Sequence, residues 1–303
     1  MDFRKSAGFD DLSRWIDAFI LDRKSQDLAQ GTLYFYRAKL KLFTNYASEN
    51  SITRISQLTP DFIRAYLIDL SHSHNPGGVH AAYRALKSFL TFFEDELGDE
   101  NYLNPIRNVK APKVSVHPLE PVPLEIVSKL LKVCDASSFC GARDHAIILF
   151  LLDTGLRASE LCSLDVDDLD VVGGSVLVRS GKGGKPRIAL IGKRTRKAVR
   201  SYLLLRPEVL TDALWLTDDG DRLSYWSLNL MLKRRAKQAG VPKPELHDFR
   251  RAFALSCLRS GMDVYSLQRL MGHSDLSVLR RYLAQTDDDL KTAHAKASPV
   301  DNL

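Results

Sequence analysis

The sequence predicts a mainly α-helical protein with two parts, a four-helix N-terminal part and a C-terminal α+β part with a small β-hairpin. Three observations predict this: helical spacing of hydrophobic residues over the first hundred positions, a proline-rich stretch after them, and two short β-rich runs in the second half. We therefore expect one domain at residues 1–103 and another at 123–303, joined by a linker at 104–122.

Four helices are expected in the first hundred residues. Segment FDDLSRWIDAFILDRK places Leu12, Trp15 and Phe19 on one helical face, and TLYFYRAKLKLFTNYASEN repeats that pattern. Thr59-Pro60 begins a third helix with proline at its first position. The Asn-Pro-Gly-Gly of SHSHNPGGVH (71–80) predicts a loop, and VHAAYRALKSFLTFFEDELG predicts a fourth helix that ends near Gly98. This set is typical of a four-helix bundle.

The second part mixes helices with a hairpin. Its segments PLEIVSKLLKVC and ARDHAIILFLLDTG have helical patterns, and GSVLVRS and KPRIALI are short β-rich runs on either side of GKGG. Several more helices follow to the end of the chain. We expect the proline-rich stretch before them, NPIRNVKAPKVSVHPLEPVP, to be an extended linker.

Composition restricts the class of protein. With 303 residues, 45% hydrophobic and 26% charged, the chain can form its own core without disulfides or metal. The polar N-terminus and the short longest apolar run, AIILFLL, favour a soluble cytoplasmic protein over a secreted or membrane one. The four cysteines lack CxxC or zinc spacing, so we expect reduced thiols.

The positive charge is unevenly distributed along the chain. Residues 1–120 contain 15 Lys and Arg against 15 Asp and Glu, and the rest of the chain contains 28 against 22. Within the second part, residues 171–207 contain ten basic side chains and no acidic one. A basic stretch is often only a solvated surface, but one this one-sided favours a polyanionic partner such as nucleic acid.

Four short motifs carry candidate functional residues, and each has an ordinary alternative. TGLRASEL (154–161) contains Arg157 and Glu160, which can be a surface ion pair. Lys182 lies at the tip of the predicted hairpin in RSGKGGKPR, which lacks the phosphate-loop pattern. HDFRRAF places His247 and Arg250 on one helical face. MGHSDLSVLRRYL contains the remaining candidates, His273 and Tyr282, on either side of a cap at Ser274, after a helix end expected at Gly272.

Taken together, these residues supply what an attack on a phosphodiester requires. Two arginines, Arg157 and Arg250, can hold the non-bridging phosphate oxygens. A tyrosine hydroxyl is a weak nucleophile near neutral pH and needs a base or a strongly basic environment. His247 is a candidate for that base, or for a hydrogen-bond donor to phosphate, and Lys182 can protonate the leaving oxygen. No carboxylate cluster for Mg²⁺ accompanies the set, so we expect metal-free chemistry without a cofactor. A third ligand is missing near His72 and His74, which argues against a metal there.

The set Arg157, Lys182, His247, Arg250, His273 and Tyr282 resembles the tyrosine recombinase (phage integrase) family, in its Xer-like two-domain branch. Segments RDHAIILFLLDTGLRASEL and HDFRRAFALSCLRSGMDVYSLQRLMGHSD match the family in order and spacing, and the resemblance covers nearly the whole chain. It implies an N-terminal core-binding (SAM-like) domain and a catalytic domain that together clamp double-stranded DNA. It also implies one-strand cleavage by Tyr282 to a 3′-phosphotyrosine, with His273 as a second phosphate donor, and recombination through a Holliday junction by a homotetramer.

The resemblance also implies a DNA-facing surface on the first domain and supporting roles elsewhere. Glu160 would support the site, and the second and fourth helices would face the major groove with Arg37, Lys41, Arg84 and Lys87. Each of these basic residues has solvated surface as its ordinary interpretation. The C-terminal tail would dock into the next protomer. Two departures concern local hydrogen bonds: Arg251 replaces a histidine common in relatives, and Val278 and Leu279 replace a frequent threonine.

Two other functions use similar residues. One is a nicking–closing activity like that of type IB topoisomerases, which would relax supercoils without a target sequence. The other is a DNA-binding regulator with a silent active site, which the complete set of Arg157, Lys182, Arg250 and Tyr282 argues against. The sequence leaves open whether the task is mobile-element integration and excision or resolution of chromosome dimers.

Overall fold

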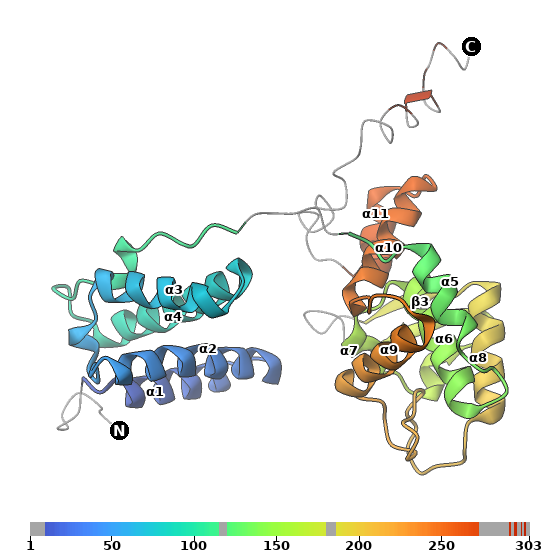
Figure 1. Ribbon diagram of the computed structural model, residues 1–303, viewed down its shortest axis with the longest axis horizontal. Coiled ribbons are helices and arrows are strands. Elements are labelled where there is room, and N and C mark those ends of the chain that lie inside the picture. The colour runs from blue at the N-terminus through green and yellow to red at the C-terminus, as the bar shows by residue number, and fades with distance from the viewer. Residues whose placement is uncertain are drawn as a thin grey trace. The chain divides into compact units, whose positions relative to one another are not determined.

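The computed structural model describes residues 10–114, 120–179 and 186–272, together with 291, 294, 295, 298 and 300. The chain divides into two compact units, residues 1–116 and 117–303 (Figure 1). Each unit has a large hydrophobic core of its own. Mostly helical structure with one small antiparallel sheet confirms the predicted fold class.

The first unit is built from four α-helices with well-defined ends. Side chains of Asp11, Thr59 and Asn75 cap the first, third and fourth helices by accepting backbone N–H bonds. The fourth helix ends at Gly98, where φ is 60°. The helices are α1 (Leu12–Ser25), α2 (Gln30–Glu49), α3 (Pro60–Ser73) and α4 (Pro76–Leu97), with a 3₁₀ turn, η2 (Ile55–Gln57), before α3.

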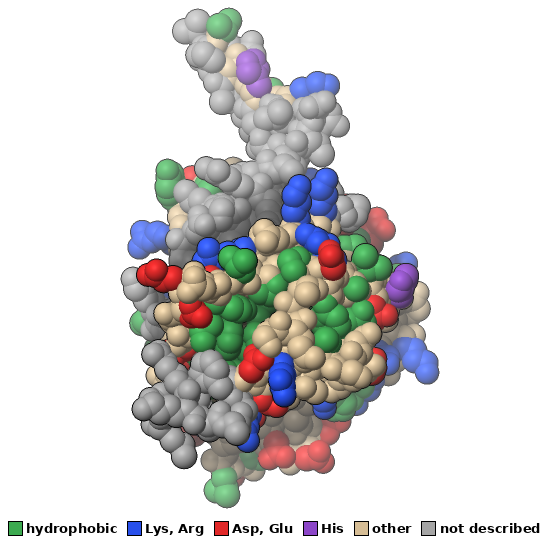
Figure 2. Space-filling model, turned by 90° about the vertical axis from the view of Figure 1, so that its left-hand side faces the viewer, with side chains coloured by type: hydrophobic (Ala, Val, Ile, Leu, Met, Phe, Trp, Pro, Cys, Tyr) green, Lys and Arg blue, Asp and Glu red, His purple; other side chains and the backbone are tan. Residues whose placement is uncertain are grey.

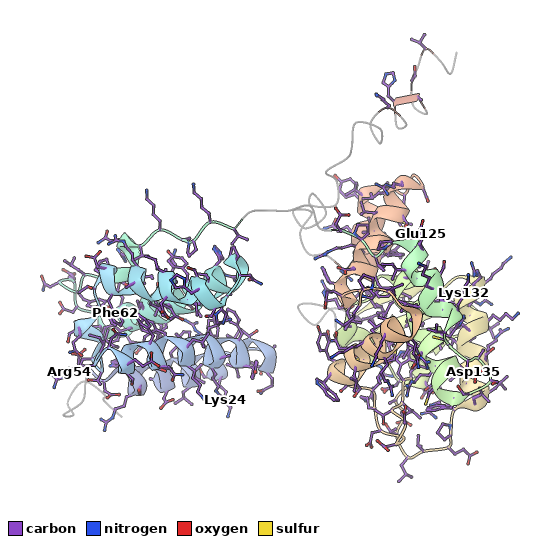
Figure 3. The ribbon with its side chains drawn as sticks, viewed as in Figure 1. Lys24, Arg54, Phe62, Glu125, Lys132 and Asp135 are labelled. Atoms are coloured by element: carbon purple, nitrogen blue, oxygen red, sulfur yellow. The ribbon has the colours of Figure 1, made fainter. Side chains whose placement is uncertain are left out.

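The core of this unit is rich in aromatic side chains. Phe19 of α1 is fully buried, and its ring meets Tyr36 of α2 and Phe89 of α4 edge-on, with ring centroids 5.0 and 5.9 Å away. The segment that follows α2 returns to the start of α1, where Leu12 N donates to Thr53 O. Figure 3 accordingly shows Arg54 at the end of the unit where α1 begins, and Lys24 in the last turn of α1.

The first unit departs from two expectations, one for the bounds of a loop and one for the start of the linker. The loop expected at residues 71–80 is short, because α3 continues to Ser73 and α4 already begins at Pro76. Asn75 caps α4 and Pro76 occupies its first turn, so the Asn-Pro-Gly-Gly sequence begins a helix. His72 therefore lies in the last turn of α3.

The start of the expected linker is also different. Residues Pro105–Asn108 form a 3₁₀ turn, η3, capped by Asn104. Ile106 and Val109 are buried in the core of the first unit, and Tyr83 donates to the carbonyl of Val109. Apolar residues at two positions of this proline-rich stretch allow it to pack on α3 and α4, so it is not extended there.

The second unit surrounds a three-stranded antiparallel sheet with helices. The strands are β1 (Leu169–Asp170), β2 (Ser175–Val178) and β3 (Arg187–Leu190), in the order β1-β2-β3. Val176 pairs with Ala189, and Val178 pairs with Arg187, as in the expected hairpin; β1 was not expected. The helices are α5 (Leu124–Lys132), α6 (Phe139–Thr154), α7 (Ala158–Cys162), α8 (Lys193–Leu205), α9 (Tyr225–Ala239), α10 (Leu246–Arg259) and α11 (Val264–Met271), with a 3₁₀ turn, η4 (Val166–Asp168), before β1.

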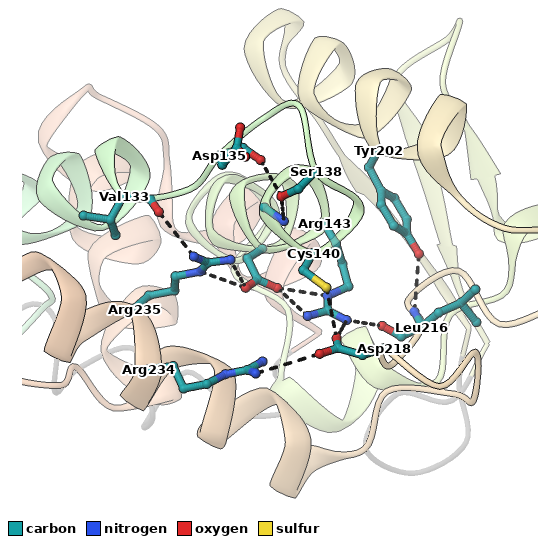
Figure 4. Close-up of polar contacts among 12 residues, drawn as sticks. Val133, Asp135, Ser138, Cys140, Arg143, Tyr202, Leu216, Asp218, Arg234 and Arg235 are labelled. Atoms are coloured by element: carbon teal, nitrogen blue, oxygen red, sulfur yellow. Dashed lines mark hydrogen bonds and ion pairs between the residues drawn. The ribbon is translucent and has the colours of Figure 1, made fainter.

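A buried ion network joins three parts of the second unit (Figure 4). Arg143 and Asp144, at the start of α6, are each 1% exposed and paired with one another. Asp144 also pairs with Arg235 of α9, and Arg143 reaches Leu216 O and Asp218 in the loop before α9. Complementary hydrogen bonds offset the cost of burying these charges.

The described cysteines are free thiols, as expected. Burial raises the pKa of both Cys134 and Cys162 to about 11. Within the described part of the chain, no helix is long and apolar enough to cross a membrane. The face of the first unit shown in Figure 2 has hydrophobic side chains near its middle and charged side chains of both signs around them.

Candidate active site

Arg157 is placed by a sharp turn between two helices. Helix α6 ends at Gly155, where φ is 59°, and Arg157 is the N-cap residue of α7. A Cβ atom at Gly155 would lie 2.4 Å from Cδ1 of Phe253, so this turn requires glycine for its φ value and for space. The Arg157 side chain remains 28% exposed, so part of it faces solvent.

Glu160 is the acceptor around which the site is built. Its side chain is 4% exposed, and it accepts hydrogen bonds at 2.8 Å from both the backbone N–H and Nη1 of Arg157. Burial raises the pKa of Glu160, but hydrogen bonds from Arg187 and Arg157 outweigh it and lower the pKa below its usual value. Glu160 is therefore an ionised carboxylate that fixes the direction of the Arg157 side chain.

A third arginine, Arg187, is part of this arrangement and was not singled out from the sequence. Its Nη1 and Nη2 atoms donate to the two carboxylate oxygens of Glu160 at 2.9 and 2.7 Å. Its Nε atom donates to the carbonyl of Leu270 at 3.1 Å. The sequence contains no clear signal for it, because Arg187 shares a face of β3 with the small buried residue Ala189, whereas the larger apolar residues Ile188 and Leu190 lie on the exposed face.

Arg250 connects the segments that carry three of the motifs. It lies on α10, is 1% exposed, and donates from Nη1 to Gly155 O at 2.5 Å and from Nη2 to Met271 O at 2.8 Å. Gly155 is two residues before Arg157, and Met271 is two residues before His273. The HDFR segment, the TGLR segment and the end of α11 therefore meet around one guanidinium.

His247 lies on the first turn of α10 and is exposed. Partial desolvation lowers its pKa, and the positive charges of Arg251, Arg250 and Arg157 lower it further, against a smaller opposite effect of Asp248. Its ring is therefore held largely neutral near pH 7 and lies within electrostatic reach of both predicted phosphate-binding arginines. Arg251 pairs with Asp248 at 2.9 Å.

Three predicted residues lie outside the described residues: Lys182, His273 and Tyr282. The described chain stops three residues before Lys182 and directly before His273. Strands β2 and β3 lead into and out of the segment with Lys182, and α11 ends as predicted at Gly272, where φ is 63°. The described site is thus an ionised carboxylate, three arginines and a neutral histidine, a positive arrangement suited to a phosphate dianion or diester.

Most of the second unit matches one known protein family. The family described as the phage integrase family matches residues 123–289, more than half of the chain. The chain belongs to the phage integrase family. This confirms the resemblance inferred from its motifs.

Curated members of the family are similar over most of the chain. Tyrosine recombinase XerC of Myxococcus xanthus is 33% identical over 279 residues, which cover 88% of this chain and 91% of the relative. Tyrosine recombinase XerA of Thermococcus kodakarensis is 34% identical over 223 residues, which cover 73% and 75%. Tyrosine recombinase XerD of Listeria innocua is 30% identical over 281 residues, which cover 90% and 94%.

Solved structures of the family share the fold. A post-cleavage complex of XerH recombinase with its difH substrate has a TM-score of 0.73 and 20% identity, and covers 90% of this chain and 82% of its own. A λ integrase tetramer bound to a Holliday junction has a TM-score of 0.70 and 18% identity, and covers 88% and 78%.

The four basic residues predicted to contact DNA lie on the surface of the first unit. Arg37 and Lys41 are one turn apart on α2, and Arg84 and Lys87 are one turn apart on α4. All four are exposed, and none has a carboxylate within 4 Å among the described residues. Their charges are therefore available to a partner on this unit.

Proposed function

We propose that this family member is a tyrosine site-specific recombinase that cleaves and rejoins DNA with Tyr282 as the nucleophile. The observation that carries the proposal is the convergence at Arg250 of the segments containing Arg157 and preceding His273. A phosphate near Arg157 would be close to the chain from which His273 and Tyr282 continue.

In the cleavage step, the Tyr282 oxygen forms a bond to the scissile phosphorus, and the bond from phosphorus to the 5′ oxygen breaks. Arg157 and Arg250 hold the two non-bridging oxygens and stabilise the charge that develops on them. Lys182 gives a proton to the departing 5′ oxygen, and His273 donates a hydrogen bond to the phosphate. The products are a 3′-phosphotyrosine and a free 5′-hydroxyl.

His247 takes the role of base in this scheme. Its lowered pKa favours the neutral ring, which is the form that accepts the Tyr282 proton. In the reverse step, a 5′-hydroxyl from the partner strand attacks the phosphotyrosine and releases Tyr282. Since each step exchanges one phosphodiester bond for another, no ATP is consumed.

The first unit would act as the core-binding domain. Arg37, Lys41, Arg84 and Lys87 would contact the DNA backbone and position the protein, while a few base contacts select the site. Four protomers would act on two duplexes in the cytoplasm, at the nucleoid. The role of the C-terminal tail belongs to this proposal too: truncation after Gln285 should abolish synapsis while preserving single-site binding.

The test is covalent trapping on DNA. The target site is first located by mapping the genomic DNA that the tagged protein binds, and a nicked substrate with that site is then incubated with pure enzyme. Wild type should accumulate a 3′ adduct that a denaturing gel resolves, and Tyr282→Phe should not. An adduct formed by the Phe variant would show that another residue is the nucleophile.

The same assay separates the alternatives. Relaxation of supercoiled plasmids that lack the target site would favour a topoisomerase-like activity. Tight site binding without any adduct from wild type would favour a silent regulator.

A further inference from the structure

Arg187 makes more contacts with the site than any role in strand pairing requires. Its side chain is 9% exposed, and its guanidinium donates to both oxygens of Glu160 and to the carbonyl of Leu270. Three of its five N–H groups are used in these bonds, which fixes the plane of the guanidinium.

The end of α11 is shaped to fit this side chain. A Cβ atom at Gly272 would lie 2.8 Å from Cδ and 2.9 Å from Nε of Arg187. Glycine at this position, with φ of 63°, therefore allows the chain to pass directly over the Arg187 side chain. The contact involves Gly272, the last residue before His273, as well as the carbonyl of Leu270.

Arg187 is also connected through the chain to the hairpin that carries Lys182. Arg187 opens β3, five residues after Lys182, so it is attached to the returning strand of the hairpin. Through Glu160 it acts on Arg157, because Oε1 of Glu160 accepts from Nη1 of both arginines. One side chain thus links the hairpin, the Arg157 turn and the chain that leads to His273.

We propose that Arg187 is a positioning residue for strand cleavage, which keeps Arg157, strand β3 and the end of α11 in register around one phosphate. This inference rests on the proposed function. Lysine cannot replace arginine here, because a single ammonium cannot donate in one plane to two carboxylate oxygens and a carbonyl. Without Arg187, Glu160 keeps Arg157 alone as an ion-pair partner among the described residues, and the carbonyl of Leu270 loses its hydrogen bond from β3.

The experiment separates positioning from stability by measuring a rate constant and an amplitude. Single-turnover formation of the 3′ adduct is followed on the nicked substrate with saturating enzyme, for wild type and Arg187→Lys. A positioning role predicts a rate constant about 100-fold lower, since a misplacement of about 1 Å can have that effect, with site binding unchanged in a gel-shift assay. A purely structural role predicts a smaller amplitude and the wild-type rate constant, and this result would overturn the proposal.

Arg235→Lys is the matched control. Arg235 also pairs with a buried carboxylate, Asp144, and donates to a backbone carbonyl, that of Val133, but it makes no hydrogen bond or ion pair to the described residues of the site. It should lower thermal stability as much as Arg187→Lys does and leave the rate constant within about 2-fold of wild type. Equal slowing in both variants would mean that the effect is general, and would overturn the proposal.

A double-mutant cycle tests the route through Glu160. If Arg187 acts through Glu160, the double variant with Arg187→Lys and Glu160→Gln should be no slower than the slower single variant. Multiplicative losses would overturn that route. Absence of an adduct with wild type would overturn the proposed function, whereas a wild-type adduct together with an undiminished rate for Arg187→Lys would overturn only this inference.

Discussion

The Arg250 guanidinium donates to the carbonyl of Gly155, a residue 95 positions away in the sequence. Its other terminal nitrogen donates to Met271 O. A buried arginine that is bonded to the backbone at both ends fixes the spacing of the chain segments around it. The residue proposed to bind phosphate is therefore also one that assembles its site.

The first prediction concerns Arg250→Lys. Lysine keeps the charge, but its single ammonium cannot bridge two carbonyls and also bind phosphate, so cleavage should slow by about 100- to 1,000-fold. Single-turnover adduct formation measures this. Arg251→Lys keeps the adjacent charge and should remain near the wild-type rate; a similar loss in both variants would contradict a specific role for Arg250.

Much of this arrangement was predictable from the sequence, for physical reasons. Arg157 and Arg250 were singled out because a fork of N–H donors suits phosphate oxygens, and Gly272 was predicted to end a helix. The helical units followed from the spacing of hydrophobic residues, and the hairpin from β-rich runs on either side of glycines.

Other features depend on tertiary contacts that leave a weaker trace. Arg187 was one of ten basic residues in a stretch without acids, and the alternation along β3 did not mark its inward direction, because the larger apolar residues Ile188 and Leu190 lie on the exposed face. The packing of Ile106 and Val109 on the first core was hidden by surrounding prolines. Asn75 was not recognised as a cap, because its Asn-Pro-Gly-Gly sequence equally favours a turn.

The second prediction is a pH dependence that belongs to His247. Desolvation and nearby arginines lower its pKa, so the base is neutral down to a pH below its ordinary value of about 6.5. The cleavage rate should fall as pH drops through this lowered pKa. Arg251→Gln removes the largest charge effect on the His247 pKa, so the acidic limb should move to higher pH. The pH–rate profile between about pH 5 and 8 measures this, and an unmoved limb would exclude His247 as the titrating group.

The third prediction concerns Lys182, the proposed acid. Lys182→Ala should cleave ordinary DNA about 100- to 10,000-fold more slowly, because the 5′ oxygen then leaves without a proton. A substrate with sulfur at the bridging 5′ position should restore the rate, since a thiolate is a far better leaving group. Arg157→Ala should not be rescued by this sulfur. Lack of rescue for Lys182→Ala would assign the lysine to phosphate binding instead.

The fourth prediction compares two glycines of the second unit that have a left-handed backbone conformation. Gly155 and Gly240 have φ of 59° and 64°, but a Cβ at Gly155 meets Phe253 at 2.4 Å, whereas at Gly240 nothing lies within 4 Å. Gly240→Ala should lower the free energy of unfolding by about 1–2 kcal/mol from backbone strain alone. Gly155→Ala should lower it by about 1–3 kcal/mol more through overpacking. Chemical denaturation measures both, and equal losses would mean that Phe253 moves away freely.

The last prediction tests the buried ion network through two aspartates that share Arg143. Asp144 is 1% exposed and pairs with Arg143 and Arg235, whereas Asp218 is 52% exposed. Asp144→Ala leaves two arginine side chains without their buried carboxylate and should lower the free energy of unfolding by about 3–5 kcal/mol. Asp218→Ala removes a largely solvated partner and should change it by at most about 1 kcal/mol. Urea denaturation of both variants measures the difference. A small loss for Asp144→Ala would mean that water or the Leu216 carbonyl compensates Arg143.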